Sequence, residues 1–122
     1  MELDELLSHA VKRQASDLHL KADAHPVLRI HGHLEVQDDL PAITREFMRR
    51  TAMRLLGEDR YNDLMGGTEK DLGYQVEGMG RFRVILITNV INAIVFLSLV
   101  VVGALVGNPN TSNVWLKPST TV

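Results

Sequence analysis

The chain of 122 residues contains no cysteine, and this absence excludes several classes of protein. Without thiols there is no disulfide scaffold, no thiolate nucleophile and no cysteine-ligated zinc site. Acidic residues follow Met1 at once, which predicts no secretory signal peptide. The net charge of −2 is unlike the strongly basic balance of proteins that coat nucleic acid, so no nucleic-acid partner is expected.

Charge itself is nearly missing from the last third of the chain. Of the 28 charged residues, 27 lie in residues 1–83, and the only later one is Lys117. Residues 84–106 contain 18 apolar residues out of 23 and no charge at all. The chain is therefore two compositions joined near Arg83, and each part needs its own interpretation.

The first forty residues predict one helix followed by short strands. Residues 2–13 carry apolar side chains at helical spacing, with acidic residues in the first turn and basic residues in the last, which complements the helix dipole. Leu18 and Leu20 then alternate with polar neighbours, as in a half-buried strand. Gly32 marks a tight turn between two further short strands, which predicts a hairpin there.

The next segment repeats the order of helices and then strands. Thr44 is a suitable N-cap for a second helix, which Gly57 would end, and residues 59–65 predict a third. Apolar residues alternate over 72–76, and a glycine-bounded turn at 78–80 leads into a partner strand. The sum predicts an α+β domain in which helices cover one face of a sheet.

Local motifs indicate no self-contained active site. His31 and His33 would share a face of one strand and could supply two metal ligands, but exposed polar residues beside a turn are the favoured interpretation, and no metal site is predicted. Glu69 and Asp71 are interpreted as surface charge in the same way. The four arginines of the second predicted helix favour a solvated surface over a patch for a polyanion or an acidic partner. No phosphate-binding loop, zinc-protease motif or serine-hydrolase motif occurs.

Five segments in order nevertheless resemble one family. They are the opening helix and the segments ASDLHL at 15–20, HPVLRIHG at 25–32, TEKDLGY at 68–74 and GRFRV at 80–84. Together they resemble the N-terminal domain of the twitching-motility, or pilus retraction, branch of the type II/IV secretion ATPase superfamily. One such motif is weak, whereas five in order with compatible spacing are specific.

The resemblance implies a PAS-like α+β domain over residues 1–97, with an apolar and then irregular tail over 98–122. In that family a RecA-like ATPase domain follows, ATP and magnesium bind with it, and six subunits form a ring. The expected partners are that ATPase domain or neighbouring subunits, and the pilus machinery. The expected location is the cytoplasm, at the inner face of the membrane if residues 84–106 contact it. Because no Walker A loop occurs, the 122 residues alone should not hydrolyse ATP.

Two arginines match the family's RFR motif, namely Arg81 and Arg83, and Arg29 is a weaker candidate. The resemblance implies that they contact nucleotide phosphates in a full-length protein, because a guanidinium group presents forked donors and a permanent charge. Strand alternation puts Arg81 and Arg83 on one face, with Phe82 on the other. The alternative is an ion pair with an acidic residue on a neighbouring strand: Glu69, Asp71 or Glu77.

The uncharged segment has three interpretations. As a helix, residues 84–106 are long enough to span a membrane. As β structure, residues 84–87 and 90–97 would form a hairpin, which the 12 valine, isoleucine and threonine residues of the segment favour. The third interpretation is the unselected end of a truncated or frame-disrupted gene. Residues 107–122 predict irregular coil under all three.

These interpretations leave three functions open. The first is the N-terminal domain of a pilus retraction motor. The second is a membrane-tethered, PAS-like binding or sensor module without catalysis. The third is a metal or small-ligand protein that uses His31 and His33.

Overall fold

The computed structural model describes residues 1–104, which form three helices and six strands in an α+β arrangement. In chain order these elements are α1 (Leu3–Lys12), β1 (Ala15–Lys21), β2 (Val27–Ile30), β3 (His33–Val36), α2 (Arg45–Leu56), α3 (Glu58–Met65), β4 (Lys70–Val76), β5 (Gly80–Asn89) and β6 (Ile94–Ala104). The predicted fold class is therefore confirmed.

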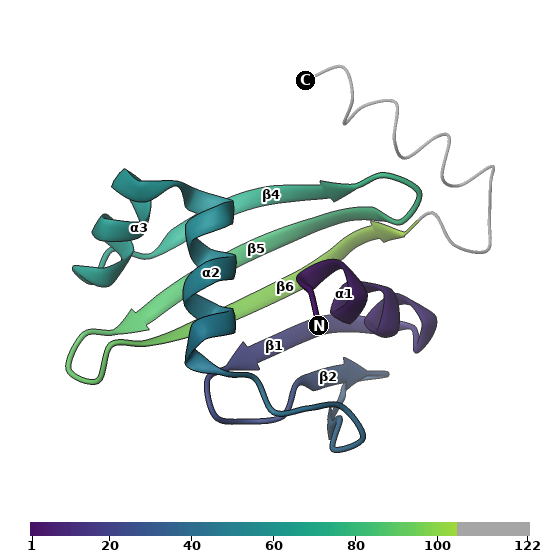
Figure 1. Cartoon of the computed structure of the whole chain (residues 1–122). Helices are drawn as coiled ribbons and strands as arrows, with labels where there is room; N and C mark the ends of the chain where they lie inside the picture. Colours follow the sequence, from purple (N-terminus) through teal and green to yellow (C-terminus); the bar gives the residue numbers. More distant parts are fainter. Residues whose placement is uncertain (105–122) are drawn as a thin grey trace.

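All six strands belong to one antiparallel sheet with the order β3-β2-β1-β6-β5-β4. The last described strand, β6, lies between β1 and β5, so the first and the last strands of the described residues are neighbours at the centre of the sheet. The three helices lie on one side of the sheet (Figure 1). The other side is called the open face below.

Helix α1 packs its apolar stripe onto the sheet. Its five buried residues follow the predicted helical spacing: Leu3, Leu6, Leu7, Ala10 and Val11. At its start the Glu2 backbone N–H donates to Glu5 Oε1 at 2.9 Å, which satisfies a donor that has no partner within the helix. Local capping and burial therefore agree on where this helix begins and which side it buries.

Helix α2 begins and ends where its sequence indicates. The Phe47 backbone N–H donates to Thr44 Oγ1 at 3.0 Å, so Thr44 is the N-cap. Gly57 follows the helix with φ +79° and ψ 170°, a conformation that essentially only glycine adopts freely, and α3 starts at the next residue. Phe47 and Met48 are buried in the core beneath the helix.

The β2–β3 hairpin corrects one premise of the metal hypothesis. His31 and Gly32 occupy its turn, with φ +50° and φ +82°. Two successive positive φ angles match the twist of a two-residue hairpin. His31 is thus a turn residue, whereas His33 begins β3, so the expectation that both share a face of one strand is wrong.

The uncharged segment forms a β-hairpin. Residues 84–89 complete β5, residues 90–93 form the turn, and β6 follows and continues past Leu97 to Ala104. Alternate side chains of the hairpin are buried beneath the helices, with Leu86, Leu97 and Leu99 all fully buried. Within residues 1–104 no helix is long and apolar enough to cross a membrane. The predicted coil at 107–122 lies outside the described residues.

Candidate functional site: the arginine-bearing face of the sheet

The candidate arginines lie on the open face. Phe82, between Arg81 and Arg83 on β5, is only 1% exposed and points into the core beneath the helices. Arg83 is exposed and Arg81 is half-buried, and both point to the opposite side, as strand alternation predicted. Arg29 alternates with buried Leu28 and Ile30 on β2, so it shares that side. The fold thus gathers all three arginines on one surface.

The strand register places Arg29 and Arg83 in one row across the sheet. Arg29 pairs with Asp17 on β1, Asp17 with Val100 on β6, and Val100 with Arg83 on β5. Three strand spacings of roughly 4.8 Å separate the two arginine backbones, or about 14 Å. They therefore form two clusters at opposite sides of the same face, and the row between them includes an acidic residue.

Arg83 forms an ion pair with Asp71 on β4. Its Nε donates to Asp71 Oδ1 at 3.1 Å, and its Nη2 donates to Oδ2 of the same carboxylate. These hydrogen bonds lower the pKa of Asp71, and they raise the pKa of Arg83. The predicted alternative of a neighbouring-strand ion pair is found for Arg83, with Asp71 as the partner. Two nitrogens of the Arg83 guanidinium group thus bind the two oxygens of one carboxylate group.

Arg81 lies beside a glycine of the edge strand. Gly73 pairs with Arg83 in the sheet, and a methyl group built on Gly73 would come within 3.7 Å of Arg81 Nη2. The Arg81 guanidinium therefore lies over β4 at van der Waals distance from residue 73. Arg81 and Arg83 together make a basic edge on this side of the face, which Asp71 partly neutralises.

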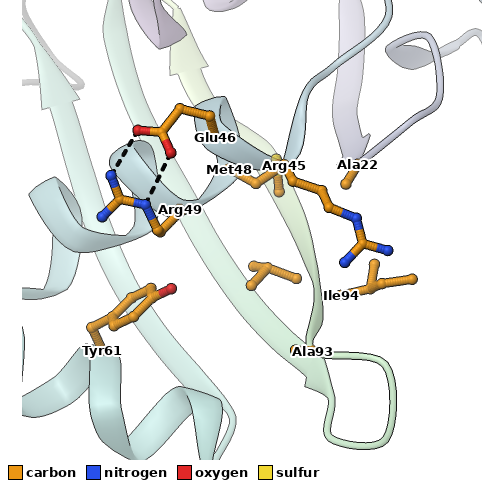
Figure 2. A pocket seen from close by; sticks show the side chains of 9 residues that line it. Ala22, Arg45, Glu46, Met48, Arg49, Tyr61, Ala93 and Ile94 are labelled. Carbon is orange, nitrogen blue, oxygen red and sulfur yellow. Dashed lines mark hydrogen bonds and ion pairs between the residues drawn. The ribbon is translucent and has the colours of Figure 1, made fainter.

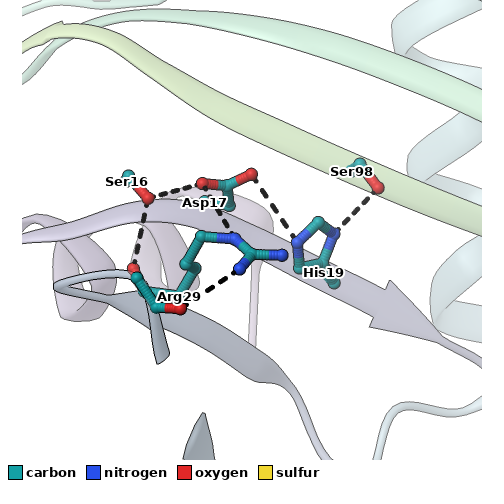
Figure 3. Close-up of polar contacts among 6 residues, drawn as sticks. Ser16, Asp17, His19, Arg29 and Ser98 are labelled. Atoms are coloured by element: carbon teal, nitrogen blue, oxygen red, sulfur yellow. Dashed lines mark hydrogen bonds and ion pairs between the residues drawn. The ribbon is translucent and has the colours of Figure 1, made fainter. Parts of the chain in front are cut away.

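Arg29 belongs to a separate polar cluster centred on Asp17 (Figure 3). Its Nε lies 3.8 Å from Asp17 Oδ1, and its Nη1 donates to the Gly32 carbonyl oxygen at 3.4 Å. His19 Nε2 lies 3.7 Å from Asp17 Oδ2, and its Nδ1 is hydrogen-bonded to Ser98 Oγ at 2.9 Å. The cluster thereby connects β2, β1 and β6 through side chains of the open face.

Successive residues from Asp17 to Leu20 in the ASDLHL segment point to opposite sides of the sheet. Leu18 and Leu20 are 1% and 2% exposed and help to form the core. Asp17 and His19 point the other way and organise the polar cluster. The segment that carries the family resemblance thus supplies both the core and the polar centre of the open face.

Sequence reasoning missed three residues of this surface: Lys21, Phe96 and Ser98. Phe96 and Ser98 lie two apart on β6 and pair with Lys21 and His19 on β1. Ser98 is the only hydroxyl-bearing residue between residues 94 and 102, an otherwise apolar stretch. This single polar residue in an apolar strand could have indicated a role for Ser98. Its partner, however, depends on the pairing of β1 with β6.

The helix side has a small pocket of about 190 Å³ between α2, α3 and the β5–β6 turn, and two arginines of α2, Arg45 and Arg49, line it (Figure 2). Arg49 donates two hydrogen bonds to Glu46, at 2.6 and 3.1 Å. Arg45 pairs with Asp23, and Arg50 with Glu2. These paired, exposed side chains agree with the predicted solvated surface. Within residues 1–104 no group of three metal-ligating side chains is found.

Solved structures show the same fold. The crystal structure of the pilus retraction motor PilT with bound ADP matches with a TM-score of 0.72 and 28% sequence identity. The match covers 84% of this chain and 29% of the PilT chain. The ATPase DotB of Legionella pneumophila matches with a TM-score of 0.71, and the match covers 81% of this chain and 28% of the DotB chain. At 18% identity, DotB supports the fold alone. The shared fold, together with homology to PilT, identifies this chain as an N-terminal domain of the type II/IV secretion ATPase family.

The sequence relatives are pilus ATPases of Pseudomonas aeruginosa. The type IV pilus retraction ATPase PilT is 31% identical over 84 residues, which cover 69% of this chain and 24% of PilT. The type IV pilus ATPase PilU is 29% identical over 84 residues, which cover 69% of this chain and 22% of PilU. The chain therefore spans about a quarter of the length of these relatives. No protein-family model matches it.

Proposed function

We propose that this chain is the PAS-like N-terminal domain of a hexameric type IV pilus retraction motor of the kind that drives twitching motility. In this proposal it works in the cytoplasm and takes part in ATP and magnesium binding only together with a RecA-like ATPase domain. The observation that carries the proposal is the homology to PilT, combined with two arginines of the matching RFR motif on one exposed face.

The geometry of Arg83 fits a phosphate. In the structure its guanidinium binds both oxygens of the Asp71 carboxylate, and a phosphate presents a similar pair of oxygens. The ion pair is exposed, so solvent screens it and exchange of the carboxylate for a more highly charged anion costs little. Arg81 lies on the same side and adds a second positive charge. Bound ATP with magnesium would supply the energy of the motor, while these arginines bind and orient its phosphates.

The open face also fits a protein partner. Beside the arginines, on the same strand β5, it exposes the apolar residue Ile87 at 47% of its surface. Exposed apolar residues next to charged ones are typical of a surface that another domain covers. We assign the β4–β5 side of this face, which carries Arg81, Arg83 and Ile87, to the ATPase domain or to a neighbouring subunit of the ring.

Co-purification with an intact pilus retraction ATPase from the same cell tests the partner. The 122-residue chain carries an affinity tag, and the ATPase is detected by immunoblot and by mass spectrometry. Co-elution is expected, because the open face lacks its covering domain in the isolated chain. Absence of the ATPase from the eluate, with the chain folded by circular dichroism, would argue against membership of the motor.

A fused protein tests the arginines. Residues 1–104 replace the corresponding region of a PilT-type ATPase, and nucleotide binding is measured with a fluorescent ATP analogue. Arg83→Gln is expected to weaken binding about tenfold, as the loss of one charge-assisted contact implies. Arg49→Gln is the matched control, because Arg49 is an equally exposed, carboxylate-paired arginine on the helix side. Equal affinity in both variants would remove Arg83 from the nucleotide site.

A further inference from the structure

A pocket of about 460 Å³ opens on the open face, between the β2–β3 hairpin and β6. It is larger than either of two pockets on the helix side, which have volumes of about 190 Å³ each. Its volume lies within the range of small-molecule sites in proteins, roughly 300–1,000 Å³. It also lies apart from Arg83 along β6, because the lining residues Phe96 and Ser98 pair with Ile87 and Ile85 of β5, whereas Arg83 pairs with Val100.

The pocket has apolar walls from two distant parts of the chain. Phe96 on β6 lines one side, and Leu34 on β3, which is 59% exposed, lines the other. The strand order explains the distance between the two walls, since β2 and β1 lie between them, and β1 presents His19 and Lys21. The two apolar walls are therefore held apart by a rigid sheet, which leaves a site that is formed before any ligand arrives.

The charged groups that line the pocket all have the same sign. Lys21 and Arg29 line it, together with His19 and His25, and none of the described lining residues is acidic. Lys21 Nζ lies 5.7 Å from the centre of the Phe96 ring, so this ammonium group contacts an aromatic face. The rim of the pocket thus combines positive charge with an aromatic surface.

Arg29 has donors to spare for a ligand. Its Nε faces Asp17 at 3.8 Å, which is too long for a direct hydrogen bond, and its Nη1 donates to the Gly32 carbonyl oxygen. Its Nη2 makes neither contact, and 40% of the side chain is exposed. Asp17 therefore orients the guanidinium group, while Nη2 takes part in neither of these two contacts.

We propose that this pocket binds a small amphipathic anion, namely a carboxylate on a flat aromatic or apolar body. The carboxylate binds Arg29 and Lys21, and the apolar body lies between Phe96 and Leu34. Ser98 Oγ and the His19 ring, already hydrogen-bonded to each other at 2.9 Å, form the polar floor. This site is independent of the proposed nucleotide contacts, which depend on Arg83.

An NMR titration of the full chain of 122 residues tests the site. The probes are 2-naphthoate and its neutral analogue 2-naphthamide, which share one ring system and differ in charge. Naphthoate is expected to bind at least about tenfold more tightly, because only its carboxylate gains charge-assisted hydrogen bonds. Amide shifts are expected at His19, Phe96 and Ser98. Shifts confined to the helix side, no shifts at millimolar ligand, or equal affinity for both probes would overturn the proposal.

Substitutions assign the contacts. Arg29→Gln and Lys21→Gln should each weaken naphthoate binding by about threefold to tenfold and leave naphthamide unaffected. Phe96→Ala should weaken both probes, because both use the ring surface. Arg50→Gln is the matched control, since Arg50 lies 5.8 Å from the Phe47 ring on the helix side. Loss of binding in Arg50→Gln, or unchanged binding in both Arg29→Gln and Lys21→Gln, would contradict the assignment.

Discussion

The Tyr74 hydroxyl donates a hydrogen bond to Asp4 Oδ1 at 2.6 Å and thereby ties α1 to the edge strand β4. The two residues are 70 positions apart in the sequence. Burial, followed by this hydrogen bond to a carboxylate, raises the pKa of Tyr74. The contact therefore links α1 to β4, the edge strand that lies three positions away from β1 in the sheet order.

Tyr74→Phe is expected to lower the free energy of unfolding by about 1.5 kcal/mol, because a hydrogen bond to a charged group is lost. In the wild type the contribution of Tyr74 is fully present below pH 10, the ordinary tyrosine pKa, and declines as the pH rises through the higher folded pKa. The variant should lack this alkaline decline. Urea unfolding at pH 7 and at several alkaline pH values measures both effects, and parallel curves would contradict the assigned pKa shift.

Leu97→Ala is expected to destabilise the domain by about 2–5 kcal/mol, because Leu97 is fully buried in the central strand and the change leaves a cavity. Ile91→Ala is the control in the same apolar segment, since Ile91 is 93% exposed in the β5–β6 turn. Thermal unfolding followed by circular dichroism separates them. Equal melting temperatures for the two variants would argue against the hairpin.

Gly57→Ala is expected to cost about 1–3 kcal/mol, because residue 57 has φ +79° and ψ 170°. Nothing lies within 4 Å of a methyl group built there, so the cost is conformational. Gly66→Ala tests the same substitution in a helical conformation, where the nearest atom is 3.5 Å away. Only the first variant should show a lower urea midpoint.

Asp71 should titrate below its ordinary pKa of about 3.9, because Arg83 hydrogen-bonds its ionised form. Any stability from the pair is therefore present at neutral pH and lost as the pH falls through this lower folded pKa. Carboxyl-detected NMR should show the Asp71 midpoint move upward in Arg83→Gln. The urea midpoint of Arg83→Gln at pH 7 should stay unchanged, since both side chains are exposed.

Much of the fold could be predicted from local patterns. The apolar spacing of α1, the Thr44 cap and the glycine turns each depend on neighbouring residues, so the sequence displays them directly. The conformation of His31 was missed, because its positive φ depends on the geometry of the whole hairpin. Hairpin β5–β6 was one of three interpretations, since apolar composition alone does not distinguish a central strand from a membrane helix.

The open face was less predictable than the core. That Arg81 and Arg83 share a side follows from alternation, but the choice of Asp71 over Glu69 or Glu77 as the partner depends on register. The meeting of His19 with Ser98 joins residues 79 positions apart, and no local signal specifies such a pair. Long-range strand pairing is thus what converts separate polar residues into a surface.

The central position of β6 also has a consequence for biosynthesis. Strands β1 and β5 each use β6 as a neighbour, so β1 completes its backbone pairing only after residue 100 has left the ribosome, and β5 only after residue 104 has. Contacts of such high sequence separation make folding slow, because loop closure must precede them. A nascent chain that stops before Ile94 would expose two unpaired strand edges, which are templates for aggregation. The nascent chain is therefore most prone to aggregation in the interval between the synthesis of β5 and the synthesis of β6.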